Sequence, residues 1–158
     1  MVVVIIGMLA SMAIPRMSRG ASGASEAAVA GNLSIVRNAL LRYAVEHRNV
    51  FPRLDAATVV SQLTGYSDDQ GNTSDTRAGV FVYGPYLAGI PPCSIGPKAG
   101  SSGICIDTVN SPPEYHEGNP AGWVYNPNTG EFLPNAPGSD LIFLGPAGTY
   151  GGQQPQGL

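Results

Sequence analysis

The chain begins with an uninterrupted apolar run. Residues 1–14 read MVVVIIGMLASMAI and contain no charged residue. As a helix this run would rise about 21 Å, less than the roughly 30 Å hydrocarbon core of a bilayer. Gly7 permits close approach of another helix, and Pro15 lacks the N–H that a helix interior needs. The stretch between them is therefore expected to be the weakest part of a long helix.

Other interpretations of this run stay open. A secretory signal peptide would have a basic segment before the run, whereas Arg16 and Arg19 follow it here. A buried core helix of a soluble protein is a second alternative. We favour a third, in which the helix packs against copies of itself or lies in a membrane.

A helical period appears further along the chain. Apolar or aromatic residues recur three or four positions apart, and charged residues occupy the other faces. The stripe predicts a helix side that is buried against a sheet, with His47 half covered at its edge and Phe51-Pro52 ending the helix. It consists of Val29, Leu33, Val36, Leu40, Tyr43 and His47.

A helix from Met1 to His47 would measure about 70 Å. The residues after position 50 form a head large enough to cover only the C-terminal half of such a helix. The other half is almost wholly apolar and cannot stay exposed to water. It must contact lipid or further copies of the chain, and this is the central functional inference from the sequence.

The head is predicted to consist of short elements joined by turns. Asp55 is a good N-cap and Gly65 a good C′ residue for a short helix. Strands are expected at residues 104–109, 122–125 and 131–133, the last two joined by a hairpin turn, with an edge strand at 140–144. Trp123 is expected to anchor the core against the helix stripe. The predicted fold is thus α+β, with a long N-terminal helix packed on a small antiparallel sheet and a loop-rich C-terminal region.

Composition and charge change near residue 50, where the predicted long helix gives way to the head. Residues 1–50 hold four Gly and one Pro, against seventeen Gly and thirteen Pro in residues 51–158. The first part has a net charge of +3 and the second a net charge of −6. An acidic head argues against a nucleic-acid partner, which would need a clustered basic surface.

Candidate chemistry is sparse in the sequence. Its two histidines, His47 and His116, stand in separate contexts, and no nucleophile, phosphate-loop or zinc motif occurs, so we expect no enzyme activity. The polar loop 67–75 offers hard oxygen ligands for calcium, although its spacing differs from an EF-hand and an ordinary solvated loop is the alternative. No other cofactor is expected. The calcium candidates are Asp68, Asp69, Asn72 and Asp75. Asn72 also begins a glycosylation sequon, Asn-Thr-Ser.

The segment VVVIIGMLASMAIP resembles the N-terminal helix of type IV pilins and of type II secretion pseudopilins, which share its hydrophobic run, Gly, small-residue patch and Pro in this order. GPYL…IPP at 84–92 and GWVYNPNTGEF at 122–132 resemble the heads of the same superfamily. That family normally has a basic leader, a peptidase site and a glutamate before the run. Since Met1 falls inside the run, none of these features is carried over to a residue here. Either the chain given starts late or the protein lacks the leader.

The resemblance implies an organisation and a function. Residues 1–50 would be the long helix, with an assembly half at 1–24 and an amphipathic half at 25–50, followed by the head at 51–144 and a tail rich in Gly, Pro and Gln at 145–158. The chain would be a pilus subunit that forms a helical homo-oligomer at the cell surface, after residing in the cytoplasmic membrane with the inner-membrane assembly machinery. Alternatives are a periplasmic major pseudopilin and a membrane-anchored surface binding module. The implied filament-core residues are Val2, Val3, Val4, Ile5, Ile6, Gly7, Leu9, Ile14 and Pro15.

The same resemblance implies how the two cysteines are bonded, because it implies an exported protein. Cys93 and Cys105 have no further Cys or His partner at zinc-site spacing. In an exported protein they would form a disulfide. Two buried free thiols are the alternative.

Overall fold

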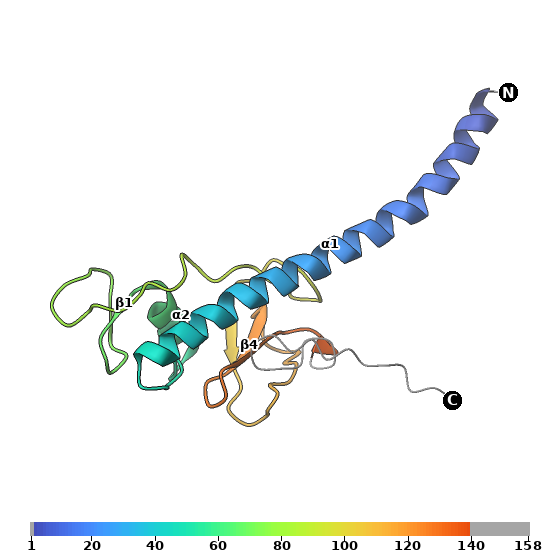
Figure 1. Cartoon of the computed structure of the whole chain (residues 1–158). Coiled ribbons are helices and arrows are strands. Elements are labelled where there is room, and N and C mark those ends of the chain that lie inside the picture. Colours follow the sequence, from blue (N-terminus) through green and yellow to red (C-terminus); the bar gives the residue numbers. More distant parts are fainter. Residues whose placement is uncertain (1, 140–158) are drawn as a thin grey trace.

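One long helix carries a small head at its C-terminal half (Figure 1). The computed structural model describes residues 2–139, with side chains from Gly23 onward. Helix α1 spans Val2–Glu46, and its N-terminal half projects beyond the head (Figure 1). The predicted α+β fold is confirmed at this level. The other elements are α2 (Ala56–Thr64), β1 (Tyr66–Ser67), β2 (Thr73–Ser74), β3 (Ile104–Ile106), β4 (Trp123–Asn126) and β5 (Glu131–Pro134).

The end of α1 differs from the prediction. Arg48 and Asn49 both have positive φ angles, of 58° and 63°, and the Asn49 N–H donates to the Ala44 carbonyl at 2.7 Å. This left-handed turn satisfies a carbonyl of the last helical turn. The helix therefore ends at Glu46, before Phe51-Pro52 is reached.

Helix α2 forms where the sequence predicts it, but its C-terminal end differs in detail. The Asp55 carboxylate accepts a hydrogen bond from the Thr58 N–H at 2.9 Å and caps the N-terminus. Gly65 is extended, with φ −104°, and does not adopt the left-handed conformation usual for a C′ glycine. Its lack of a side chain still matters, because a Cβ there would lie 2.9 Å from the Ser61 carbonyl oxygen and 3.2 Å from that of Ser74.

The main sheet is mixed, which corrects the expected antiparallel sheet. Strand β4 is central; it pairs parallel with β3 and antiparallel with β5. The predicted hairpin is confirmed, with Asn126 opposite Glu131 at its turn, while β3 is shorter than predicted. A second, two-stranded sheet of β1 and β2 lies within the stretch that we expected to be an irregular loop.

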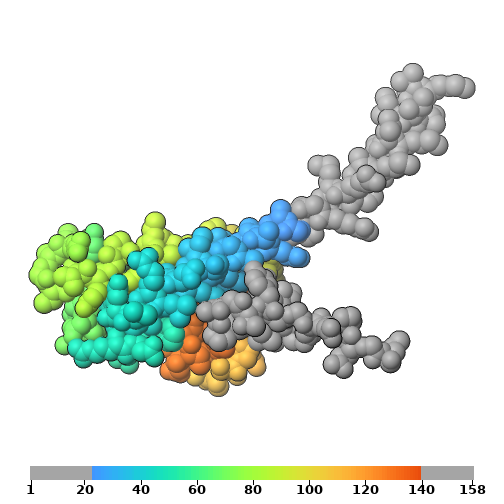
Figure 2. Space-filling model, viewed as in Figure 1, coloured from blue at the N-terminus to red at the C-terminus, as the bar shows by residue number. Residues whose placement is uncertain are grey.

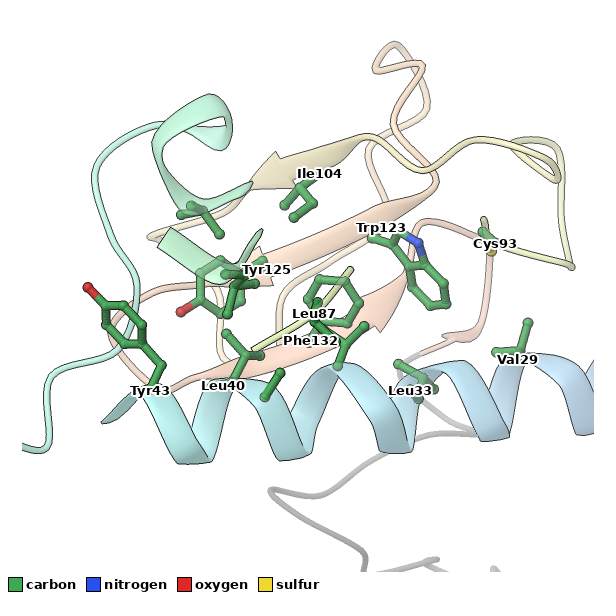
Figure 3. Packing of buried hydrophobic residues seen from close by; sticks show 14 residues of the cluster. Val29, Leu33, Leu40, Tyr43, Leu87, Cys93, Ile104, Trp123, Tyr125 and Phe132 are labelled. Carbon is green, nitrogen blue, oxygen red and sulfur yellow. The ribbon is translucent and has the colours of Figure 1, made fainter. Parts of the chain in front are cut away.

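The core lies between α1 and one face of the main sheet (Figure 3). Trp123, Tyr125 and Phe132 point from the sheet toward the helix stripe, and the rings of Trp123 and Phe132 lie 5.1 Å apart with their planes tilted by 30°. Because side chains alternate along a strand, Cys105 and Val124 point to the opposite face, where they form a smaller cluster with Ala121. A parallel pair needs a crossover connection, which here comprises residues 107–122.

Some expectations fall outside the described residues. They are the edge strand at 140–144, the tail at 145–158 and the side chains of the filament-core residues between Val2 and Pro15. Within the described part of the chain, no helix is both apolar enough and long enough to cross a membrane.

Candidate functional site

The exposed side of α1 is the candidate site. The packing of the opposite, buried side on the head determines which residues of α1 are exposed. All predicted packing residues of the stripe from Val29 to Tyr43, together with Trp123, are buried in one cluster. Polar contacts lock the helix against the head as well: Asn32 Nδ2 donates to the Pro92 carbonyl, and an Arg37 guanidinium nitrogen donates to the Phe132 carbonyl, each at 3.1 Å. The part of α1 from Val29 to Tyr43 is therefore fixed to the head by both apolar packing and hydrogen bonds.

The opposite side of α1 exposes apolar side chains. Ile35 is 55% exposed, Leu41 40% and Val45 81%. Leu41 and Val45 lie one turn apart, and Arg42 lies two turns from Ile35 on the same side. Arg42 is exposed and forms no salt bridge with another described residue. We call these four residues the outward face of α1.

His47 is fully packed where α1 ends, which corrects the half-covered position expected from the sequence. Its Nδ1 lies 2.8 Å from the Tyr43 carbonyl oxygen and its Nε2 3.1 Å from the Ser67 hydroxyl. A carbonyl only accepts, so Nδ1 carries a proton and donates to Tyr43, and in the neutral ring Nε2 accepts from the Ser67 hydroxyl. The ring also stacks on Tyr43 at 3.7 Å, and burial raises the pKa of Tyr43 to about 12, an effect that the nearby Arg53 partly opposes.

Ser67 and His47 form the kind of hydrogen bond found between the serine and histidine of a catalytic triad, but the site cannot act on a substrate. Ser67 is completely buried in β1, so a substrate cannot reach its hydroxyl. The pair fastens the C-terminal end of α1 to the small sheet. The hydroxyl of Tyr86 adds a further contact by donating to the Glu46 carboxylate.

The loop predicted to hold calcium is organised by its own hydrogen bonds. Asp68 accepts from the backbone N–H groups of Gln70 and Asn72 at 2.9 Å and from the Asn72 side chain at 2.7 Å. Asp69 forms a salt bridge with Arg48. These contacts use the carboxylates that calcium would need, and no cluster of acidic, His or Cys side chains suited to a metal occurs among the described residues. Calcium binding at this loop stays a prediction, and the side-chain amide of Asn72, the predicted glycosylation acceptor, donates to Asp68.

Both cysteines are buried free thiols, which corrects the predicted disulfide. Cys93 belongs to the cluster between the sheet and α1, close to Trp123 in Figure 3. Cys105 points to the other face of the sheet, where the Asn119 amide donates to its sulfur at 3.2 Å. Burial raises the pKa of both thiols. The two thiols belong to different clusters, and the alternative left open by the sequence, two buried free thiols, holds.

The crossover contains a polar cluster that sequence reasoning missed. Burial raises the pKa of Asp107, but hydrogen bonds from the backbone of Glu114, Asn110 and Val109 and from the Asn110 side chain outweigh it and hold that pKa well below its usual range. His116 Nε2 lies 3.4 Å from the same carboxylate. The signal available in the sequence was the Asp and Asn residues beside a Pro pair, which favour turns closed by side chains.

A polar groove of about 320 Å³ lies at the end of α2, and Ser61, Thr64, Gly65, Thr73, Ser74 and Asp75 line it. Two of its hydroxyls donate to carbonyl groups of α2 itself. Ser61 donates to the Ala57 carbonyl and Thr64 to the Val60 carbonyl, at 3.0 and 2.8 Å. These contacts leave the outward face of α1 as the stronger candidate for an interaction.

The comparisons with known proteins found no relatives: no protein-family model, curated protein or solved structure matches this chain.

Proposed function

We propose that the chain is the structural subunit of a type IV pilus-like filament, which polymerises through its N-terminal helix. The observation that carries this proposal is the course of α1, whose N-terminal half projects beyond the head (Figure 1). The first fourteen residues of the chain, which form most of that half, contain no charged residue. A projecting apolar helix gains stability only by contacting lipid or other such helices.

Helix bundling would supply the energy of the polymer. Burial of apolar surface stabilises by roughly 25 cal/mol per Å², and each helix in a bundle is buried against several neighbours. The contacts of Asn32 and Arg37 with the head support the proposal, because they would transmit force between the filament core and the surface. Before assembly the subunit would reside in the cytoplasmic membrane with the inner-membrane assembly machinery, and afterwards in a cell-surface homopolymer.

A major pseudopilin of a type II secretion system is the second candidate. The segments 84–92 and 122–132 favour it, and they contact each other through Trp123 and Pro91. Neighbouring genes distinguish the two: a secretin and minor pseudopilins indicate secretion, whereas a retraction ATPase indicates a pilus. A membrane-anchored binding module remains a distant third.

Electron microscopy of sheared cell-surface material tests the proposal. Wild-type cells should yield micrometre-long fibres that contain this chain. Val4→Asp should abolish the fibres, because burying an ionised carboxylate in an apolar helix bundle costs on the order of several kcal/mol. Val4→Ile is the matched control and should preserve fibre yield. Normal fibres from Val4→Asp would contradict bundling, and the absence of fibres from the wild type would contradict the pilus.

A further inference from the structure

Three charged residues interrupt the otherwise uncharged N-terminal part of α1. They are Arg16, Arg19 and Glu26, the charges of residues 2–36. Arg19 and Glu26 are seven residues apart, which is close to two helical turns, so they lie on the same face of α1. All three precede Val29, the first residue of the stripe that packs on the head. The charges thus lie between the apolar run and the segment that holds the head.

Glu26 has no ionic partner among the described residues of its own chain. It is exposed and forms no salt bridge there, and the part of α1 to which it belongs (blue) lies at the edge of the head in Figure 2. Arg19 lies about 10 Å away along the helix axis, whereas side chains on one helix pair at spacings of three or four residues. A carboxylate placed in a bundle of apolar helices is costly unless it is paired. Glu26 therefore needs a cation from another molecule once the helices bundle.

A second copy of the helix offers that cation at a defined axial offset. If two parallel copies lie level, each charge faces its own equivalent, and like charges at an interface are unfavourable. An offset of seven to ten residues instead brings Glu26 of one copy level with Arg19 or Arg16 of the other. With a helical rise of about 1.5 Å per residue, this offset is about 10 to 15 Å. It also leaves the apolar runs of the two copies partly side by side.

Two other partners fit these charges less well. An anionic lipid headgroup would attract Arg16 and Arg19 but repel Glu26. An antiparallel copy would also pair Arg19 with Glu26, but it would place the apolar run beside residues 31–43, whose exposed residues include Asn38 and Arg42. A parallel copy satisfies the charges and the apolar run together.

We infer that Arg16 and Arg19 of one copy bind Glu26 of the next, and that this contact sets the axial offset between neighbouring helices. Each copy gives its carboxylate to one neighbour and its guanidinium groups to the other. Such a contact joins two different surfaces, so it repeats along an open helical polymer when it does not close a ring. A polar contact in an apolar helix interface is well suited to fixing register. The inference rests on the proposed function and identifies what fixes the register of the filament core.

Charge reversal in full-length fibres tests this contact. Glu26→Arg should lower the fibre mass per cell about tenfold or more, because it gathers like charges between neighbouring helices. Arg16→Glu with Arg19→Glu should lower it similarly, and all three substitutions together should recover most of the wild-type yield. Glu114→Arg, an equal charge change at an exposed position of the head, is the matched control for Glu26→Arg and should assemble normally.

The axial offset is a second, independent measurement. Helical reconstruction of wild-type fibres from electron micrographs should show contacting α1 helices offset by about 10 to 15 Å. If the arginine variants are missing from the membrane fraction, Glu26→Arg and the offset still decide. Normal assembly of Glu26→Arg, or an offset outside this range, would overturn the inference alone. If the wild type forms no fibres, both the inference and the proposed function fail.

Discussion

The indole nitrogen of Trp123 donates a 2.8 Å hydrogen bond to the carbonyl oxygen of Pro91. The bond joins the central strand β4 to a segment that lies 32 positions earlier in the chain and has no regular structure. Pro92, the next residue, accepts from Asn32 of α1. The Pro pair thus links the helix to the sheet, and Trp123 fixes where that link lies.

Trp123→Phe should lower the free energy of unfolding by about 2 kcal/mol, because it removes the donor to Pro91 and leaves a small cavity. Tyr125→Phe removes only one hydrogen bond, the 2.8 Å contact of its hydroxyl with the Pro52 carbonyl, and should cost about 1 kcal/mol. Urea titration of both variants measures the difference. If Trp123→Phe is as stable as the wild type, the link to Pro91 contributes nothing to the fold.

Gly122 is required by a close approach of two backbones. A Cβ there would overlap with the Ser101 carbonyl oxygen and lie 2.9 Å from the Cβ of Cys93. Gly122→Ala should therefore destabilise the head by about 3 kcal/mol, since neither neighbour is the free end of a flexible side chain. Gly118→Ala is the matched control, with open space around its added methyl group, and should change stability by about 0.5 kcal/mol at most. Equal melting temperatures of the two variants would contradict the observed approach.

The sequence predicted those features that depend on local periodicity or turn chemistry. The stripe from Val29 to Tyr43 follows the helical period, and Asp55 follows a capping preference, so both are visible in short windows of residues. The hairpin of β4 and β5 is equally local, because a turn of Asn126 to Gly130 connects its strands.

The features that the sequence did not reveal depend on contacts between distant segments. The direction in which β3 pairs with β4 depends on the path of a crossover of sixteen residues, 107–122, and no short window encodes that path. The predicted disulfide was wrong for the same reason, since the spacing of Cys93 and Cys105 does not reveal which cluster each residue joins. His47 appeared to be an edge residue because its partner Ser67 comes from another element.

The free state of the two thiols can be tested directly. The urea midpoint should be the same with and without a reductant, whereas a disulfide closing a loop of this length would contribute about 3 kcal/mol. Alkylation in denaturant without reductant should label both Cys93 and Cys105 in mass spectrometry. Cys93→Ser should cost about 2 kcal/mol, because it places a hydroxyl in the core. Failure to label the two cysteines, or a urea midpoint that falls when reductant is added, would show that they form a disulfide.

The pH dependence of stability should reveal the buried carboxylate of the crossover. Asp107 has a lower pKa in the folded chain than in the unfolded chain, so its contribution is complete above the unfolded value of about 4 and declines as the pH falls below it. Asp107→Asn cannot accept the same set of N–H donors and should lower stability by about 2 kcal/mol at neutral pH.

The difference between the wild type and Asp107→Asn should narrow steadily as the pH is lowered from about 5 to about 3. Urea unfolding at several pH values measures it. Glu114→Gln is the matched control, because Glu114 contacts Asp107 through its backbone N–H and not through its carboxylate. It should remain within about 0.5 kcal/mol of the wild type at neutral pH. A difference for Asp107→Asn that is independent of pH would show that the N–H donors around Asp107 do not favour its ionised form.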